Sequence, residues 1–236
     1  MRFYNVLFFS VLFFITVIKL KAQTLHNSSC PSISTDFVLD WGSETYTAGS
    51  LSQTINNIDG SGYNATFTVS GATGTLTTEG GVNTPGITNS LSGGASALHF
   101  SSTGLTSTEN IIVDISFSPP VAGNIAFDVY NIIDAGTPGS KITVYAITAD
   151  GNFIIPSFTD NGNPSWNLDG PGVIDGDASS TAGTNDQAGI QFSSFNQVTN
   201  VFVEFSRCIG CGNSANTEFA IGDIDFCLVP DTDQDG

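Results

Sequence analysis

Basic residues are scarce in this sequence. It contains 5 Lys and Arg against 22 Asp and Glu, which gives a formal net charge of −17. Three of the five basic residues lie among the first 22, so the rest of the chain keeps only Lys141 and Arg207 and carries a formal charge of −20. Such a chain repels nucleic-acid phosphates and anionic lipid headgroups, which excludes both as partners. The acidity either serves solubility alone or is relieved by bound divalent cations.

Residues that commonly carry catalysis are also few. The chain has two histidines, His26 and His99, and no Gly-x-Ser-x-Gly nucleophile motif. The period-2 pattern around His99 predicts a surface or packed histidine. A glycosidase needs only two carboxylates, which 22 acids could supply, but no pair stands out. We therefore expect a protein that is not an enzyme, with a secreted carbohydrate-active hydrolase as the less favoured alternative.

Helical periodicity is missing beyond the first 22 residues. Apolar residues instead alternate with polar ones in short runs rich in Phe, Val, Ile and Thr, separated by Gly, Asn, Asp, Ser and Pro. The pattern predicts an all-β protein, an antiparallel, jelly-roll-like β-sandwich of roughly nine to eleven strands over residues 23–229. The expected strands lie near residues 37–41, 63–69, 98–100, 111–117, 125–129, 142–146, 153–158, 190–192, 201–205 and 219–226.

The alternation of apolar and polar residues changes parity within the last expected strand, residues 219–226. Phe219 and Ile221 share one parity, whereas Ile224 and Phe226 share the other. One face can bury all four only if an extra residue shifts the register. Glycine is the usual residue at such a point, so the sequence predicts a β-bulge at Gly222-Asp223 that turns Asp223 or Asp225 toward one end of the sandwich.

The apolar segment at the start of the chain is short, which favours a cleaved signal peptide over a transmembrane anchor, the less favoured alternative. The run from Val6 to Ile18 is shorter than the ~18 residues that a transmembrane helix needs. Arg2 precedes the run and Ala22 ends it, which is the arrangement of a cleaved secretory signal peptide over residues 1–22. The sequence thus predicts a secreted or cell-surface protein.

Cysteine is limited to four residues, Cys30, Cys208, Cys211 and Cys227. In an exported protein an even number predicts disulfides, with three possible connectivities. Proximity favours Cys208–Cys211, and Cys30–Cys227 would then join the start of the domain to its last strand. A four-cysteine zinc site is the less favoured alternative, because a second closely spaced pair is absent.

An aromatic residue in a polar loop is a candidate ligand platform. Trp166 is flanked by Asn163, Asn167 and Asp169, a composition that suits stacking on a sugar ring with hydrogen bonds around it. Tyr46 and Tyr130 are lesser candidates. Such an aromatic can equally anchor its loop by covering the core. Asp175-Gly176-Asp177 is either a cation ligand or an ordinary turn.

The last six residues alternate acids with other residues before a glycine. Asp231, Asp233, Asp235 and Gly236 follow an Asp-x-Asp-x-Asp-Gly pattern, which resembles the start of a thrombospondin type 3 repeat. The spacing lets alternate oxygens wrap a hard cation and the glycine makes the turn. The resemblance implies calcium binding by residues 230–236, with the later ligands and further domains of the same protein following. A plain linker is the alternative.

The body of the chain resembles the β-sandwich modules of large secreted and surface proteins of bacteria. The resemblance covers Phe37 to Phe226 and rests on Trp41, on turns such as Asp59-Gly60-Ser61-Gly62, and on Ile221-Gly222-Asp223-Ile224-Asp225-Phe226. Relatives often place acids after the strand at residues 125–129. This chain has Asn131 and Asp134 there and so departs in part from that pattern. Jelly-roll carbohydrate-binding modules resemble this chain in the same general pattern of strands and turns.

These observations favour one function over two others. The favoured function is a non-catalytic extracellular module of a larger protein that serves adhesion or glycan binding. A purely structural spacer domain and a hydrolase are the alternatives.

Overall fold

The computed structural model describes residues 35–89, 94–132, 140–159, 166–176, 187–207 and 216–228. This part of the chain is nearly all β-structure, with two short 3-10 turns, η1 (Ile58–Gly60) and η2 (Thr73–Thr75). None of its helical segments is long and apolar enough to cross a bilayer. The all-β prediction is confirmed. Residues 1–22 and 230–236, for which a signal peptide and a calcium loop were predicted, lie outside the described residues.

The described residues form fifteen strands, more than the nine to eleven expected, because several are very short. The strands are β1 (Thr35–Leu39), β2 (Ser52–Ile55), β3 (Asn64–Gly71), β4 (Thr78–Glu79), β5 (Val82–Asn83), β6 (Gly86–Thr88), β7 (Ala97–Thr103), β8 (Asn110–Tyr130), β9 (Ser140–Thr148), β10 (Phe153–Ile154), β11 (Ser157–Thr159), β12 (Trp166–Gly170), β13 (Val173–Gly176), β14 (Gln187–Arg207) and β15 (Asn216–Leu228).

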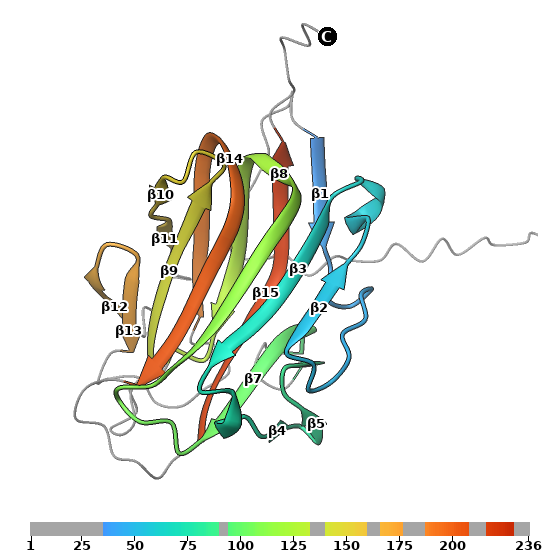
Figure 1. Ribbon diagram of the computed structural model, residues 1–236. Coiled ribbons are helices and arrows are strands. Elements are labelled where there is room, and N and C mark those ends of the chain that lie inside the picture. The colour runs from blue at the N-terminus through green and yellow to red at the C-terminus, as the bar shows by residue number, and fades with distance from the viewer. Residues whose placement is uncertain are drawn as a thin grey trace, which may run out of the picture.

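Two long strands, β8 and β14, hold the two layers together. They pair antiparallel along their lengths, with register shifts between Ser194 and Asn200. The first part of β8 pairs with β3, whereas its last part pairs with β15. The hydrogen-bonded path therefore folds over where β8 and β14 bend, and the strands lie in two layers (Figure 1). The chain was expected to end a strand at Pro119-Pro120. It bends there instead.

Each layer has a continuous order of neighbours. The front layer in Figure 1 runs β2–β3–β8–β14–β9–β13–β12, with β10 beside β9. The back layer runs β6–β7–β15–β8–β14–β11, and β1 pairs with the part of β15 that β7 leaves open. All of these pairings are antiparallel, as expected for a sandwich of the jelly-roll kind.

The core lies between the layers and follows the period-2 pattern. Val113 and Ile115 of β8 and Val203 of β14 point inward from the front layer and are 0% exposed. Three stacked rings cross the interior: Phe100 and Phe205 each lie 4.5 Å from Phe219, centroid to centroid. Burying a ring of this size contributes about 2–3 kcal/mol, so this stack is a main stabilising contact between the layers.

The bulge predicted in the last strand is present. The register of β15 against β8 shifts between Ile221 and Ile224, and Phe219, Ile221, Ile224 and Phe226 are all 0% exposed. The extra residues turn the Gly222 carbonyl and the Asp223 carboxylate toward Trp41. The indole Nε1 donates to Gly222 O at 2.9 Å, and the Trp41 backbone N–H donates to Asp223 Oδ1 at 2.9 Å.

Cys227 lies in the last part of this strand with its side chain buried. It is 3% exposed and is disulfide-bonded. Cys30, Cys208 and Cys211 lie outside the described residues, so the pairing of the four cysteines stays a prediction.

Candidate functional site

Trp166 is not the exposed platform that its surroundings in sequence suggested. Its side chain is 9% exposed, its indole Nε1 donates to Gln187 O at 3.1 Å, and its ring lies 6.1 Å from Phe158. Trp166 lies opposite Gly176 across the β12–β13 pair, and its indole packs on the hydrophobic core beside Phe158. The prediction of a sugar platform at Trp166 is therefore wrong, and the anchoring alternative holds.

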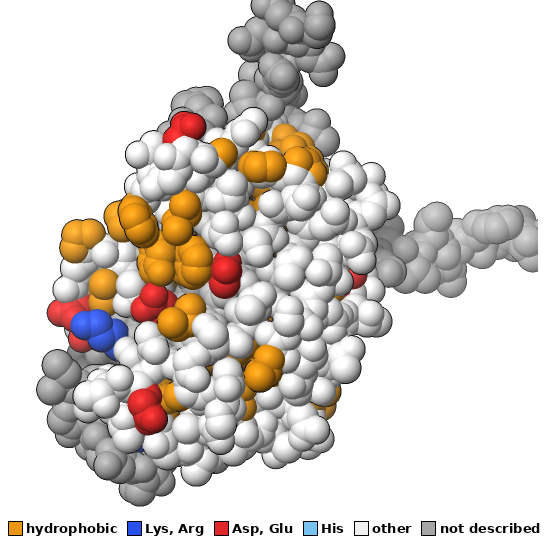
Figure 2. Space-filling model, viewed as in Figure 1, with side chains coloured by type: hydrophobic (Ala, Val, Ile, Leu, Met, Phe, Trp, Pro, Cys, Tyr) orange, Lys and Arg blue, Asp and Glu red, His pale blue; other side chains and the backbone are white. Residues whose placement is uncertain are grey.

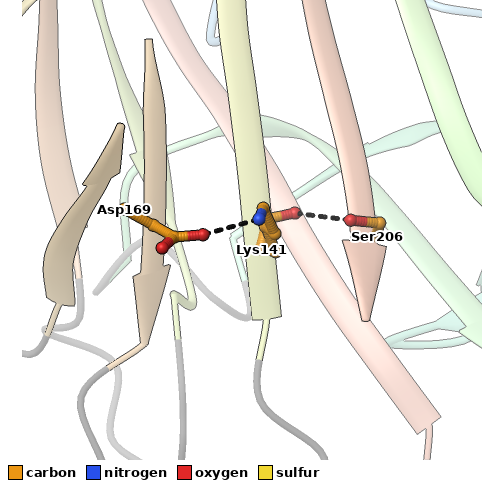
Figure 3. Close-up of polar contacts among 3 residues, drawn as sticks. All are labelled: Lys141, Asp169 and Ser206. Atoms are coloured by element: carbon orange, nitrogen blue, oxygen red, sulfur yellow. Dashed lines mark hydrogen bonds and ion pairs between the residues drawn. The ribbon is translucent and has the colours of Figure 1, made fainter. Parts of the chain in front are cut away.

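The polar residues around Trp166 do not gather into a site. Asn163 lies outside the described residues, and Asn167 and Asp169 are exposed on the edge strand β12. Asp169 Oδ2 forms an ion pair with Lys141 Nζ at 2.6 Å, and Ser206 Oγ donates to Lys141 O at 3.5 Å (Figure 3). An ion pair this exposed is worth at most ~1 kcal/mol, so it fixes a sheet edge only weakly.

The other aromatic and acidic candidates are also accounted for. Tyr46 is 9% exposed and its hydroxyl donates to Ser50 O at 3.0 Å, and Tyr130 is 8% exposed. Neither presents a ring face to solvent. Asp175 is half-buried in β13 and Asp177 lies outside the described residues. Within the described ranges no three His, Cys, Asp or Glu side chains are grouped to hold a metal ion, and Asp231, Asp233 and Asp235 lie beyond them.

A different group of aromatic side chains lies on the outer face of the front layer. Phe153 is 70% exposed, and its ring lies 5.8 Å from that of Tyr145. Tyr145 in turn stacks on Phe202 at 4.9 Å, with the two planes 13° apart. We call Phe153, Tyr145 and Phe202 the aromatic surface. Figure 2 shows hydrophobic side chains gathered at the left of this face, over β9 and β10, with acidic side chains beside them.

Hydrogen-bonded polar side chains border the aromatic surface. The Tyr145 hydroxyl donates to Glu204 Oε1 at 3.1 Å, and Asn110 Nδ2 donates to Glu204 Oε2 at 3.4 Å. Asn200 Nδ2 donates to Asp114 Oδ1 at 2.8 Å. Burial, with the Glu204 carboxylate next, raises the pKa of Tyr145 to about 12, so the phenol stays protonated and holds this carboxylate in place. The surface therefore combines ring faces with fixed hydrogen-bond acceptors.

The outward direction of two residues of the aromatic surface could have been predicted from strand parity in the sequence. Val144 and Val201 are inward residues of their strands, and parity therefore directs Tyr145 and Phe202 outward. Two outward aromatics in separate strands are unusual enough to mark a surface. The register that places Tyr145 opposite Phe202 exists only in the folded sheet.

Two acidic side chains of β15, Glu218 and Asp223, have raised pKa values. Burial, with the nearby Glu79 carboxylate, raises the pKa of Glu218 to about 7, and Ser101 Oγ lies 3.5 Å from Glu218 Oε1. Burial also raises the pKa of Asp223 to about 6. Carboxyl groups of this kind can hold a proton near neutral pH. His99 of β7 lies opposite Ala220 of β15 and is 0% exposed, its Nδ1 lies 2.8 Å from Thr88 Oγ1, and burial lowers its pKa to about 4. His99 is thus a packed, neutral residue.

Comparison with known proteins gives only distant structural likenesses. No known protein family matches the sequence, and no curated protein matches it. One similar solved structure is the Clostridium thermocellum xylanase 10B CBM22-1–GH10 modules complexed with xylohexaose, at 11% identity and a TM-score of 0.33, covering 61% of this chain and 24% of that one.

Two other likenesses extend over nearly the whole of the compared chain. The K2 cleaved adhesin domain of Lys-gingipain is 16% identical with a TM-score of 0.32, covering 81% of this chain and 97% of the domain. The family 11 carbohydrate-binding module of the C. thermocellum cellulase Lic26A-Cel5E is 11% identical with a TM-score of 0.28, covering 82% and 95%. This chain therefore spans about a quarter of the xylanase but nearly all of the adhesin domain and of the family 11 module.

Proposed function

We propose that this protein is a non-catalytic glycan-binding module and that the aromatic surface is its binding site. The observation that carries the proposal is the exposed ring of Phe153 beside the Tyr145–Phe202 stack, bordered by Glu204 and Asp114. The C–H faces of a sugar ring pack on aromatic rings, while its hydroxyl groups donate to carboxylates held in place. A β-sheet face positions both kinds of side chain rigidly.

The structural-spacer alternative does not need this surface. A spacer gains nothing from a phenylalanine that is 70% exposed, because an exposed ring loses the free energy that burial would provide. The pairing of Tyr145 with Glu204 and of Asn200 with Asp114 also orders polar groups that a spacer could leave mobile. Ordered acceptors beside an exposed ring favour recognition of a ligand.

Affinity gel electrophoresis against soluble polysaccharides tests the proposal. The wild-type protein should be retarded by at least one polymer, and Phe153→Ala should remove most of that retardation. Leu168→Ala is the matched control, because Leu168 is 65% exposed and lies on the edge strand β12, which β13 separates from β9. Equal retardation of Phe153→Ala and wild type, or no retardation by any polymer, would overturn the proposal. Circular dichroism verifies that both variants remain folded.

We also propose an extracellular location and calcium binding by residues 230–236. The support is the sequence alone: the apolar run from Val6 to Ile18 and the Asp231, Asp233, Asp235 and Gly236 pattern. Calorimetry should give a dissociation constant on the order of millimolar, as in extracellular calcium modules. Calcium binding should be tighter in a protein that continues past Gly236. If Asp231→Asn and Asp233→Asn bind calcium as tightly as the wild-type protein, the proposed calcium loop is wrong. The proposed glycan site does not depend on this result.

A further inference from the structure

A single row of side chains crosses the whole front layer beside the aromatic surface. Tyr145 of β9 lies opposite Phe202 of β14, which lies opposite Asp114 of β8. Asp114 lies opposite Thr68 of β3, and Thr68 opposite Ser52 of β2. Because directly paired residues point to the same face of a sheet, all five project outward. We call Tyr145, Phe202, Asp114, Thr68 and Ser52 the cross-strand row.

The length of this row suits a chain of sugar rings. Neighbouring strands lie about 4.8 Å apart, so five strands span roughly 19 Å. A hexose ring is about as long as the spacing between two strands. An oligosaccharide laid across the strands would therefore place about one ring over each of them, and the row would contact four or five rings.

The chemistry of the row changes from one end to the other. Tyr145 and Phe202 offer apolar ring surface, and Phe153 extends it beyond β9. Thr68 and Ser52 are exposed hydroxyl residues at the opposite end, and Asp114 lies between the two kinds. The sugar at the aromatic end would be held by packing, and the sugars over β3 and β2 by hydrogen bonds.

The charges on this face exclude an anionic glycan. Asp114 and Glu204 both lie beside the aromatic surface. The two basic residues after the first 22 are not available to balance them: Arg207 is 2% exposed, and Lys141 is paired with Asp169 at 2.6 Å. Carboxylates accept hydrogen bonds and cannot donate them. A matching ligand must donate hydrogen bonds and carry no negative charge, which describes a neutral polysaccharide.

We infer that the ligand is an uncharged, hydroxyl-rich polysaccharide that lies across the strands along the cross-strand row. This inference rests on the proposed glycan-binding function and adds the charge, direction and length of the ligand. It makes two demands that glycan binding by itself does not. Neutral polymers must bind where acidic ones do not, and affinity must grow with oligosaccharide length until the row is filled.

A polymer panel tests the charge of the ligand. Barley β-glucan, galactomannan, arabinoxylan and laminarin are neutral, alginate and polygalacturonate are anionic, and glycol chitosan is cationic. We expect retardation in at least one neutral gel and none in the anionic gels, at both low and high salt. Retardation by an anionic polymer, or by glycol chitosan alone, overturns the inference but leaves glycan binding in place. No retardation in any gel would overturn the proposed function itself.

An oligosaccharide series tests the direction and length. With fragments of the retained polymer, affinity measured by calorimetry should rise from the disaccharide to about the pentasaccharide and then level off. Thr68→Val keeps the size of the side chain and removes its hydroxyl group, so it should weaken hexasaccharide binding about three- to tenfold while leaving the disaccharide unaffected. Thr78→Val is the matched control on β4, outside the front layer. Equal affinity for all lengths, or no effect of Thr68→Val on the hexasaccharide, would show that the ligand does not follow the row.

Discussion

Trp41 and Asp223 are 182 residues apart in the sequence, and the backbone N–H of Trp41 donates to Asp223 Oδ1 at 2.9 Å. The same tryptophan is 1% exposed and donates its indole N–H to Gly222 O. These two bonds use the carboxylate and the carbonyl that the bulge in β15 turns aside. The segment after β1 is thereby fixed to the last strand, and the bulge acts as its attachment point.

Asp223→Ala should destabilise the protein by about 1–3 kcal/mol, because it leaves the part-buried N–H of Trp41 without an acceptor. Asp223→Asn keeps an acceptor oxygen and removes the charge, so we expect a loss of less than about 1 kcal/mol. Urea denaturation followed by tryptophan fluorescence measures both. Equal losses in the two variants would mean that this hydrogen bond does not contribute.

Stability should fall as the pH rises from about 5 to 8. The pKa of Glu218 is raised to about 7 and that of Asp223 to about 6, so the folded protein binds these protons more tightly than the unfolded chain does. A carboxyl group with a raised folded-state pKa stabilises the protein below its unfolded pKa and loses that effect as the pH passes the folded value. After allowance for solvent screening at the half-exposed Glu218, we expect a change on the order of 1 kcal/mol.

Thermal unfolding between pH 5 and pH 8 measures this dependence. Glu79→Gln removes the carboxylate that, after burial, most raises the pKa of Glu218, so the variant should show a smaller fall in Tm over the same range. A Tm that rises with pH in the wild-type protein would contradict the expectation.

Gly123→Ala should be strongly destabilising, by at least about 2–3 kcal/mol. Gly123 lies where β8 bends between the layers, has a φ of 141°, and a Cβ placed there would come 2.0 Å from the carbonyl oxygen of Cys227. Gly74→Ala is the control, because nothing lies within 4 Å of its added Cβ, and it should change stability by no more than about 0.5 kcal/mol. Equal denaturation midpoints would show that the bend tolerates a side chain.

Trp166→Ala should cost about 3–5 kcal/mol of stability and leave polysaccharide binding unchanged in whatever protein remains folded. The reason is that the indole covers the core beside Phe158 and is 9% exposed. Trp166→Phe loses the hydrogen bond to Gln187 and should cost only about 1 kcal/mol from that source. If the Trp166→Ala protein has normal stability but no longer binds polysaccharide, then Trp166 contacts the ligand and this expectation is wrong.

The sequence by itself determined the fold class and the bulge, because both depend on the period of 2 along a strand. Alternation in runs such as Ile111 to Phe117 is a local property, and covalent geometry converts it directly into inward and outward faces. The change of parity between Ile221 and Ile224 is equally local. Both residues can face a closely packed interior when a bulge lies between them.

Only the tertiary structure decided which outward side chains meet. Tyr145, Phe202 and Asp114 become neighbours through the registers of β9, β14 and β8, and register depends on the packing of the whole sheet. Trp166 was expected to be exposed because its sequence neighbours are polar, but in the folded protein its indole packs on the core beside Phe158. Local composition sets which residues can bind a ligand, whereas contacts between distant strands set which of them are exposed together.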